Sequence, residues 1–121
     1  MKARVTGLII GLLLFSSVGM ADSLVGKDAP EITLREWITT GSPDVKNLAG
    51  TVYAVEFWAT WCHSCVKNMP HLVELNNKYK DQGLSIIALS EDRSPDDVRK
   101  FVEAKKINFH VAIDKGTVDA F

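Results

Sequence analysis

The feature that most constrains this chain is a pair of cysteines, Cys62 and Cys65, placed where one residue pattern gives way to another. Residues 51–58, before the pair, are mostly β-branched and aromatic, which predicts a buried strand. Residues 64 to about 80 carry apolar side chains at helical spacing. One sulfur therefore lies at the start of a helix and the other one turn along it. A C-x-x-C pair at such a junction is typical of redox chemistry.

The remaining pattern predicts an α/β fold. Residues 31–34 alternate polar and apolar side chains, which favours a short first strand, and residues 84–89 and 108–113 read as two further strands. Between the last two, Ser94 is placed to cap a helix that begins with Pro95 and runs to about Lys106. This order predicts a mostly parallel sheet flanked by helices.

Composition limits the class of protein. The chain has 121 residues, 46% of them hydrophobic and 24% charged, which is typical of one globular domain. A net charge of −1 offers no electrostatic attraction to nucleic acid, so we expect no nucleic-acid partner. The sequence gives no indication of an oligomeric state.

The N-terminal residues have the pattern of a secretion signal. Lys2 and Arg4 precede an apolar run over 5–18, and small residues occupy positions 19 and 21. We expect residues 1–21 to be a signal peptide cleaved after Ala21, leaving one domain over residues 22–121 that is periplasmic or otherwise exported. The alternative is an uncleaved anchor with the domain facing the periplasm, although the apolar run is short of the roughly 20 residues that a span needs.

Cys62 is the expected nucleophile of the pair. Unpaired amides and the helix dipole at a first turn stabilise an anion, and the thiolate is the species that attacks disulfides. Cys65 would then resolve the mixed disulfide. His63, when protonated, would stabilise the thiolate further; otherwise it is a solvated polar residue. A purely structural bridge is disfavoured because it would close a very short loop.

No metal or other cofactor is expected at this pair. A zinc site needs four ligands, usually as two close pairs, and the sequence has one pair. Covalent haem attachment needs C-x-x-C-H, and Val66 occupies the last position. A copper-binding module that uses the two cysteines and a histidine remains an alternative without enzymatic activity.

Glu56 is the third candidate for the site. It interrupts an otherwise apolar strand six residues before Cys62, so we expect it to be buried beneath the cysteine pair. A buried carboxyl group would be costly unless it stayed protonated or found partners. Such a group is suited to accept and return the proton of Cys65. The alternative is an exposed glutamate on an edge strand.

These residues resemble the TlpA-like branch of the thioredoxin superfamily, which includes ResA-type exported thiol-disulfide oxidoreductases. The segments V-G-K-D-A-P at 25–30, F-W-A-T-W-C-x-x-C at 57–65 and Met69-Pro70 match family motifs in order. The resemblance implies a thioredoxin-like fold, with Cys62 as nucleophile, Cys65 as resolving cysteine and Glu56 at the place of a buried acid. It further implies that Trp61 shapes access to the pair.

The resemblance also implies partners. Protein thiols and disulfides would be the substrates, with reduction as the direction and a membrane electron donor or acceptor to complete the cycle. A peroxiredoxin-like thiol peroxidase is the alternative enzyme, because that family shares the A-P-x-x-x-L opening.

Two positions depart from the family pattern. Asn68 stands where ResA-like members have a tuning glutamate, and no proline follows Asp114 where the family has a cis-proline loop, two strands and a helix. We therefore expect a thioredoxin-like domain that is incomplete at its C-terminus, with one sheet edge open.

Overall fold

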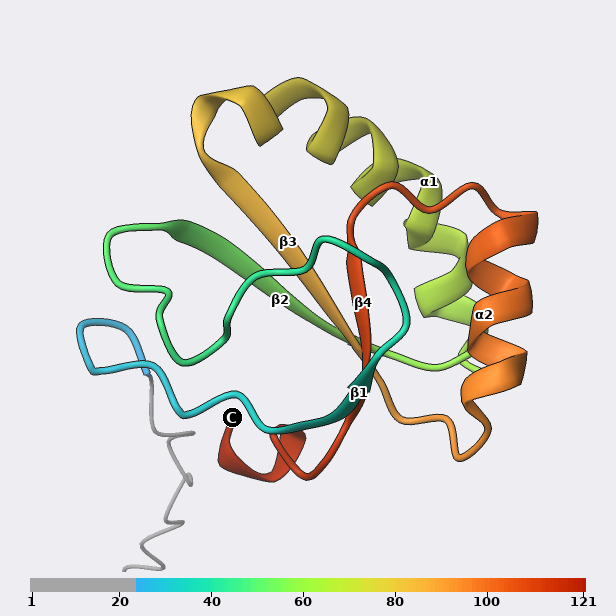
Figure 1. Ribbon diagram of the computed structural model, residues 1–121, viewed down its shortest axis with the longest axis horizontal. Coiled ribbons are helices and arrows are strands. Elements are labelled where there is room, and N and C mark those ends of the chain that lie inside the picture. The colour runs from blue at the N-terminus through green and yellow to red at the C-terminus, as the bar shows by residue number, and fades with distance from the viewer. Residues whose placement is uncertain (1–23) are drawn as a thin grey trace, which may run out of the picture.

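The computed structural model describes residues 24–121, and the predicted signal peptide over residues 1–21 lies outside them. Two strands come first in the described range, and helices and strands alternate after them (Figure 1). In chain order they are β1 (Leu34–Trp37), β2 (Val52–Trp58), α1 (His63–Tyr79), the 3-10 helix η1 (Lys80–Gln82), β3 (Leu84–Ser90), α2 (Pro95–Ala104), β4 (His110–Asp114) and the 3-10 helix η2 (Val118–Ala120). Within residues 24–121, no helix is long and apolar enough to cross a membrane.

The strands form one sheet in the order β1-β4-β3-β2. β2 pairs with β3, and β3 with β4, in parallel, whereas β1 runs antiparallel to β4. The predicted α/β fold with a mostly parallel sheet is confirmed. The two helices and the last three strands begin and end within one or two residues of the predicted positions.

The first strand was predicted at 31–34, and this is wrong because β1 lies at Leu34–Trp37. The backbone of Thr33 is bonded outside the ladder: its N–H donates to Oγ1 of Thr117 at 2.9 Å, and its carbonyl accepts from that hydroxyl at 2.7 Å. Pairing with β4 therefore begins at Leu34, opposite Asp114. The alternation over 31–34 correctly indicates that Ile32 faces the core, where it is 5% exposed, but not where pairing begins.

Both faces of the sheet are covered. α1 and α2 pack on one face; in Figure 1, α2 lies at the right of the view and α1 runs from the right across the top. The other face is covered by the segments before β1 and between β1 and β2. The helix side is built from Met69, Leu72, Val98, Ile86, Ala88, Val111 and Ile113, and the opposite side from Ile32, Ile87, Leu89 and Ala112 with Val45 and Leu48 packed against them.

The helix boundaries follow from local chemistry. Ser94 caps α2 as predicted, since its Oγ accepts from the N–H of Asp97 at 3.3 Å and Pro95 takes the first helical position. The chain leaves α1 through η1 and turns into β3 at Gly83, whose φ of +96° is a left-handed conformation that favours glycine.

The parallel strands determine where the site lies. The carboxyl ends of β2, β3 and β4 meet at one end of the sheet, because the three strands run in the same direction. The segments that follow them, 59–62, 91–92 and 115–118, are therefore neighbours in space. β2 lies at an edge of the sheet within residues 24–121.

Candidate active site

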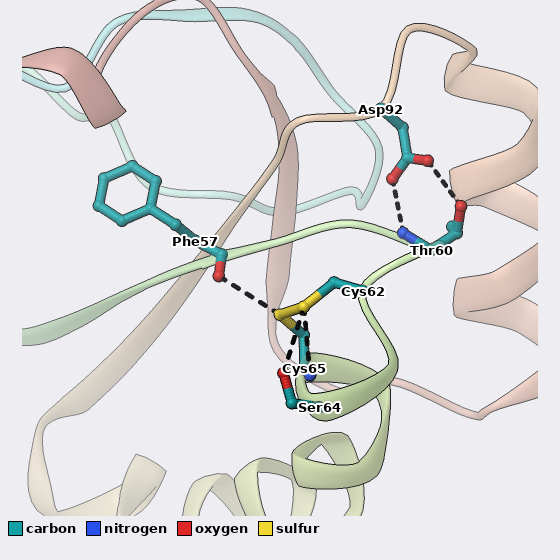
Figure 2. Close-up of a disulfide and its surroundings, with 6 residues drawn as sticks. All are labelled: Phe57, Thr60, Cys62, Ser64, Cys65 and Asp92. Atoms are coloured by element: carbon teal, nitrogen blue, oxygen red, sulfur yellow. Dashed lines mark hydrogen bonds between the residues drawn. A yellow bond between two sulfur atoms is a disulfide. The ribbon is translucent and has the colours of Figure 1, made fainter.

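Cys62 and Cys65 form a disulfide, with their Cα atoms 5.3 Å apart (Figure 2). Cys62 is the N-cap of α1 and Cys65 lies in its first turn. The turn between β2 and α1 leads into the pair, and it is closed by a hydrogen bond of 3.0 Å from the N–H of Cys62 to the carbonyl of Ala59. The predicted position of the pair at a strand-to-helix junction is confirmed.

The sulfur of Cys62 lies at the positive end of the helix. The N–H of Cys65 donates to Sγ of Cys62 at 3.4 Å, and the first helical bond runs from the N–H of Val66 to the carbonyl of Cys62 at 3.0 Å. The first turn of α1 holds no acidic residue. When the disulfide is reduced, this position favours a thiolate on Cys62 through the free amides and the helix dipole.

The second sulfur lies deeper. Sγ of Cys65 lies 4.0 Å from the carbonyl oxygen of Phe57 on β2, and Cys65 packs against the core on the helix side. Oγ of Ser64 lies 3.6 Å from Sγ of Cys62. Access to the pair is through a shallow, largely apolar pocket of about 160 Å³, lined by Phe57, Trp58, Ala59, Trp61, Cys62, Cys65 and Glu91.

Trp61 and His63 flank the nucleophile and both face solvent. Trp61 is 74% exposed and lines the pocket that contains both cysteines. This placement agrees with a side chain that shapes access to the pair. His63 is the first residue of α1 and is also exposed. Its effect on the thiolate stays a prediction.

The expectation that Glu56 is buried is wrong. It lies on β2 opposite Ala88 of β3, and it is only partly covered because β2 is an edge strand in the described residues. Alternate residues of a strand share a face, so Glu56 lies on the same side as Trp58, where α1 and Cys65 pack. Glu56 therefore lies on the side of the sheet where the cysteine pair packs, but it is not buried there. Its proton-transfer role stays a prediction.

Two acidic residues after β3 were not among the predicted site residues. Asp92 is 7% exposed and accepts hydrogen bonds from Thr60 in the cysteine loop, the segment 59–62 between β2 and α1. Glu91 lines the pocket that contains both cysteines. The signal that indicates them is positional: polar residues directly after one parallel strand lie beside the residues that follow its neighbour.

The carboxyl group of Glu91 is perturbed. Partial burial, followed by the charge of Asp114, a hydrogen bond to Asp114 and the charge of Asp119, raises the pKa of Glu91 above its usual range. Its backbone N–H donates to the carbonyl of Trp58 at 2.9 Å, which ties the end of β3 to the end of β2. Glu91, a neighbour of the cysteine pair, therefore keeps its own proton to a higher pH than an ordinary glutamate does.

Within residues 24–121, no group of three or more His, Cys, Asp or Glu side chains is placed to hold a metal ion.

A strand, a C-x-x-C turn and a helix on a mostly parallel sheet define a thioredoxin-like protein, and solved structures agree. The thioredoxin domain of a thiol-disulfide oxidoreductase from Bacteroides vulgatus superposes with a TM-score of 0.63 at 25% identity, over 77% of this chain and 66% of that one. A thiol:disulfide interchange protein from Bacteroides sp. has a TM-score of 0.53 at 31% identity, over 58% and 47%.

The chain belongs to the AhpC/TSA family, whose model matches residues 25–120. It is 41% identical over 93 residues to a thiol-disulfide oxidoreductase ResA of Bacillus cereus, covering 77% of this chain and 53% of that protein. ResA of Bacillus subtilis (strain 168) is 29% identical over 117 residues, covering 93% and 64%. The resemblance to ResA-type proteins is confirmed, and the chain spans about half the length of the first of these relatives, 53%, and 64% of the second.

Proposed function

We propose that this chain exchanges disulfides with cysteine-containing proteins through the Cys62–Cys65 pair, and that it does so as a reductase. The observation that carries the proposal is the position of Cys62 as the N-cap of α1 with Cys65 bonded to it. A sulfur in that position is a good nucleophile and a good leaving group, because the helix end stabilises its anion. The ResA-type relatives, which are named thiol-disulfide oxidoreductases, support the same chemistry.

The cycle begins with both cysteines reduced. The Cys62 thiolate attacks a disulfide of the substrate, so that one mixed S–S bond forms and one substrate thiolate leaves. The Cys65 thiol, after losing its proton, attacks Sγ of Cys62, and the second substrate thiolate leaves as the Cys62–Cys65 bond forms. Two electrons have passed to the substrate. The pair ends in the disulfide state that the structure shows.

Glu56 is the proposed acceptor of the Cys65 proton, and Trp61 the side chain that shapes the approach of the substrate. Glu56 shares the helix side of the sheet with Cys65, and Trp61 lines the pocket that contains both sulfurs. His63, the exposed residue next to Cys62, would add a positive charge to the thiolate in its protonated form.

Location and partners complete the proposal. The sequence pattern over residues 1–21 supports export to the periplasm, where a disulfide-reducing protein must receive electrons from a donor at the membrane because the compartment is oxidising. The net charge of −1 gives no reason to add nucleic acid to its partners.

The proposal is tested by reduction of insulin disulfides with dithiothreitol as electron donor. We expect the wild-type chain to accelerate the reaction and Cys62→Ser to lose the acceleration. Cys65→Ser should accumulate a mixed disulfide with insulin, detected by mass spectrometry under non-reducing conditions. A correctly folded Cys62→Ser protein that is as active as wild type would contradict the proposal.

The same preparations separate the alternatives. A peroxiredoxin-like enzyme would consume hydrogen peroxide at a rate that depends on Cys62, with little insulin reduction. A copper-binding module would retain stoichiometric copper after purification under reducing conditions and would lack turnover in both assays.

A further inference from the structure

Asp92 is joined to the cysteine loop by two hydrogen bonds to one residue, Thr60. Oδ2 accepts from the backbone N–H of Thr60 at 2.8 Å and Oδ1 accepts from its hydroxyl at 2.6 Å (Figure 2). Oδ2 also accepts from the hydroxyl of Ser90 at 2.7 Å, and the N–H of Asp92 donates to that hydroxyl at 3.1 Å. Both carboxylate oxygens are therefore bonded, and the side chain is 7% exposed, so its orientation is fixed.

The two bonds from Thr60 to Asp92 form a tether, and they hold the middle of the loop over residues 59–62. It lies between Ala59, whose carbonyl closes the turn with the N–H of Cys62, and Trp61, which is 74% exposed. The tether connects this turn to the end of β3, the neighbouring strand of the rigid sheet. Movement of Thr60 would therefore be passed directly to Cys62, two residues further along.

We propose that Asp92 is a positioning residue for the redox pair: by holding Thr60, it keeps the sulfur of Cys62 over the first turn of α1. This inference rests on the proposed redox role of the pair. The stabilisation of an anion at a helix end falls off within one turn, and Sγ of Cys62 now accepts from the N–H of Cys65 at 3.4 Å. A loosened loop would therefore lose thiolate stabilisation quickly.

The consequence for redox chemistry has a definite sign. A stabilised thiolate favours the reduced pair and makes the disulfide easier to reduce. Loss of the tether should therefore make the disulfide harder to reduce. The charge of Asp92 has the opposite effect, because a nearby negative charge destabilises a thiolate. Because the two effects have opposite signs, a variant that loosens the tether and keeps the charge of Asp92 isolates the effect of position.

Thr60→Val removes the hydroxyl bond and keeps the Asp92 charge, whereas Asp92→Asn removes the charge and weakens both bonds. Thr60→Ser keeps the hydroxyl and is the conservative control. Thr40→Val is the matched control, since Thr40 is an exposed threonine following β1 at the opposite end of the sheet. His63 and Glu91, the other titratable groups beside Cys62 and in the pocket of the pair, are unchanged in every variant.

The first measurement is the equilibrium of the full chain with glutathione. One Cys62–Cys65 disulfide and two glutathione molecules give the dithiol and one glutathione disulfide, so atoms and the two electrons balance. We expect Thr60→Val to lower this reduction constant by about tenfold, which corresponds to about 30 mV for a two-electron couple. Asp92→Asn should lower it by less, because the loss of its negative charge partly offsets the loss of the tether. Thr60→Ser and Thr40→Val should match the wild type within about twofold.

The second measurement is the rate at which the reduced pair reacts with iodoacetamide between pH 4 and 10. We expect the midpoint of the Cys62 profile to move to higher pH in Thr60→Val and Asp92→Asn and to stay in place in both controls. Circular dichroism of each variant confirms that the fold is retained. If Asp92→Asn does not fold, the comparison of Thr60→Val with Thr60→Ser alone tests the positioning role.

Any one of three results overturns the proposal. The first is a Thr60→Val protein with both readouts at the wild-type value. The second is an Asp92→Asn disulfide that is easier to reduce while Thr60→Val has no effect, since Asp92 would then act by charge alone. The third is a Thr60→Ser shift as large as that of Thr60→Val, since packing would then be the cause.

The role of Asp92 and the proposed function can fail separately. Neither the glutathione equilibrium nor the iodoacetamide reaction uses a protein substrate. A chain that is inactive toward insulin but shows the expected shifts in Thr60→Val would contradict the proposed function and support the positioning role of Asp92.

Discussion

The backbone N–H of Cys65 donates to Sγ of Cys62 at 3.4 Å, so the first cysteine of the redox pair is also the N-cap of α1. One side chain therefore has a structural and a chemical role. The cap satisfies one of the free amides that begin a helix, and the same amide stabilises the sulfur when it becomes an anion.

This double role predicts different stabilities for two variants that both lack the disulfide. Cys62→Ser keeps an N-cap oxygen, whereas Cys62→Ala has none. We expect Cys62→Ser to exceed Cys62→Ala by about 1 kcal/mol in free energy of unfolding, measured by urea titration with Cys65 kept reduced. Ser94→Ala, which removes the cap of α2, supplies the reference for a lost cap. Equal stabilities of the two Cys62 variants would contradict the N-cap role of position 62.

Glu56→Gln tests the proton-transfer step. Glu56 lies on the side of the sheet where Cys65 packs, but it is partly exposed, so water can replace part of its role. General acid–base groups typically contribute 10²–10⁴-fold, and for this partly exposed position we expect a smaller loss, about tenfold, in insulin reduction. The matched control is Glu103→Gln, an exposed glutamate on α2. If the two variants have the same rate and the same pH profile, Glu56 has no part in the step.

Glu91 predicts a pH dependence of stability. Partial burial and the nearby Asp114 and Asp119 raise the pKa of Glu91, so the folded chain holds this proton more tightly than the unfolded chain. The stability it contributes is therefore present at low pH and is lost as pH rises through the raised value. Glu91→Gln should raise the melting temperature at pH 7 and have little effect near pH 4. The gain should be small because the residue is exposed and solvent screens the repulsion. A lower melting temperature at pH 7 would contradict this sign.

The sequence predicts the elements well because their signals are local. Apolar spacing marks the helix after Cys62, and the cap Ser94 with Pro95 marks the start of α2. The cysteine position follows from the same signals, since it depends only on where a strand ends and a helix begins. The first strand was misplaced because its start depends on Thr33 and Thr117, which are 84 positions apart in the chain.

The site was predicted only in part for the same reason. The burial of Glu56 depends on which strands lie beside β2, and this neighbour relation is not encoded in the strand itself. The tether from Asp92 to Thr60 joins residues 32 positions apart, and it becomes visible only when β3 is known to lie next to β2. A pattern search along one segment cannot find such pairs.

Asp114, at the carboxyl end of β4, supports the largest stability prediction. Burial alone would raise the pKa of this carboxyl group, but hydrogen bonds from Thr117, Val118 and Gly116 outweigh burial and lower it. The backbone bonds are 3.0 Å from Gly116, 3.0 Å from Thr117 and 3.3 Å from Val118, and the side chain is 8% exposed. The carboxylate form of Asp114 therefore fixes the turn over residues 115–118, and Thr117 of this turn is hydrogen-bonded to Thr33.

We expect Asp114→Asn to lower the free energy of unfolding at pH 7 by about 2 kcal/mol, because hydrogen bonds to a buried charge contribute about 1.5–3 kcal/mol. A lowered pKa means that this stability is present above the pKa of the unfolded chain and is lost as pH falls through the folded value. The difference between wild type and Asp114→Asn, measured by urea titration, should therefore shrink as pH falls below about 4. Asp119→Asn, which neutralises an exposed carboxylate on η2, is the matched control. A difference that persists undiminished at the lowest pH at which the chain stays folded would mean that geometry, and not charge, makes Asp114 stabilising.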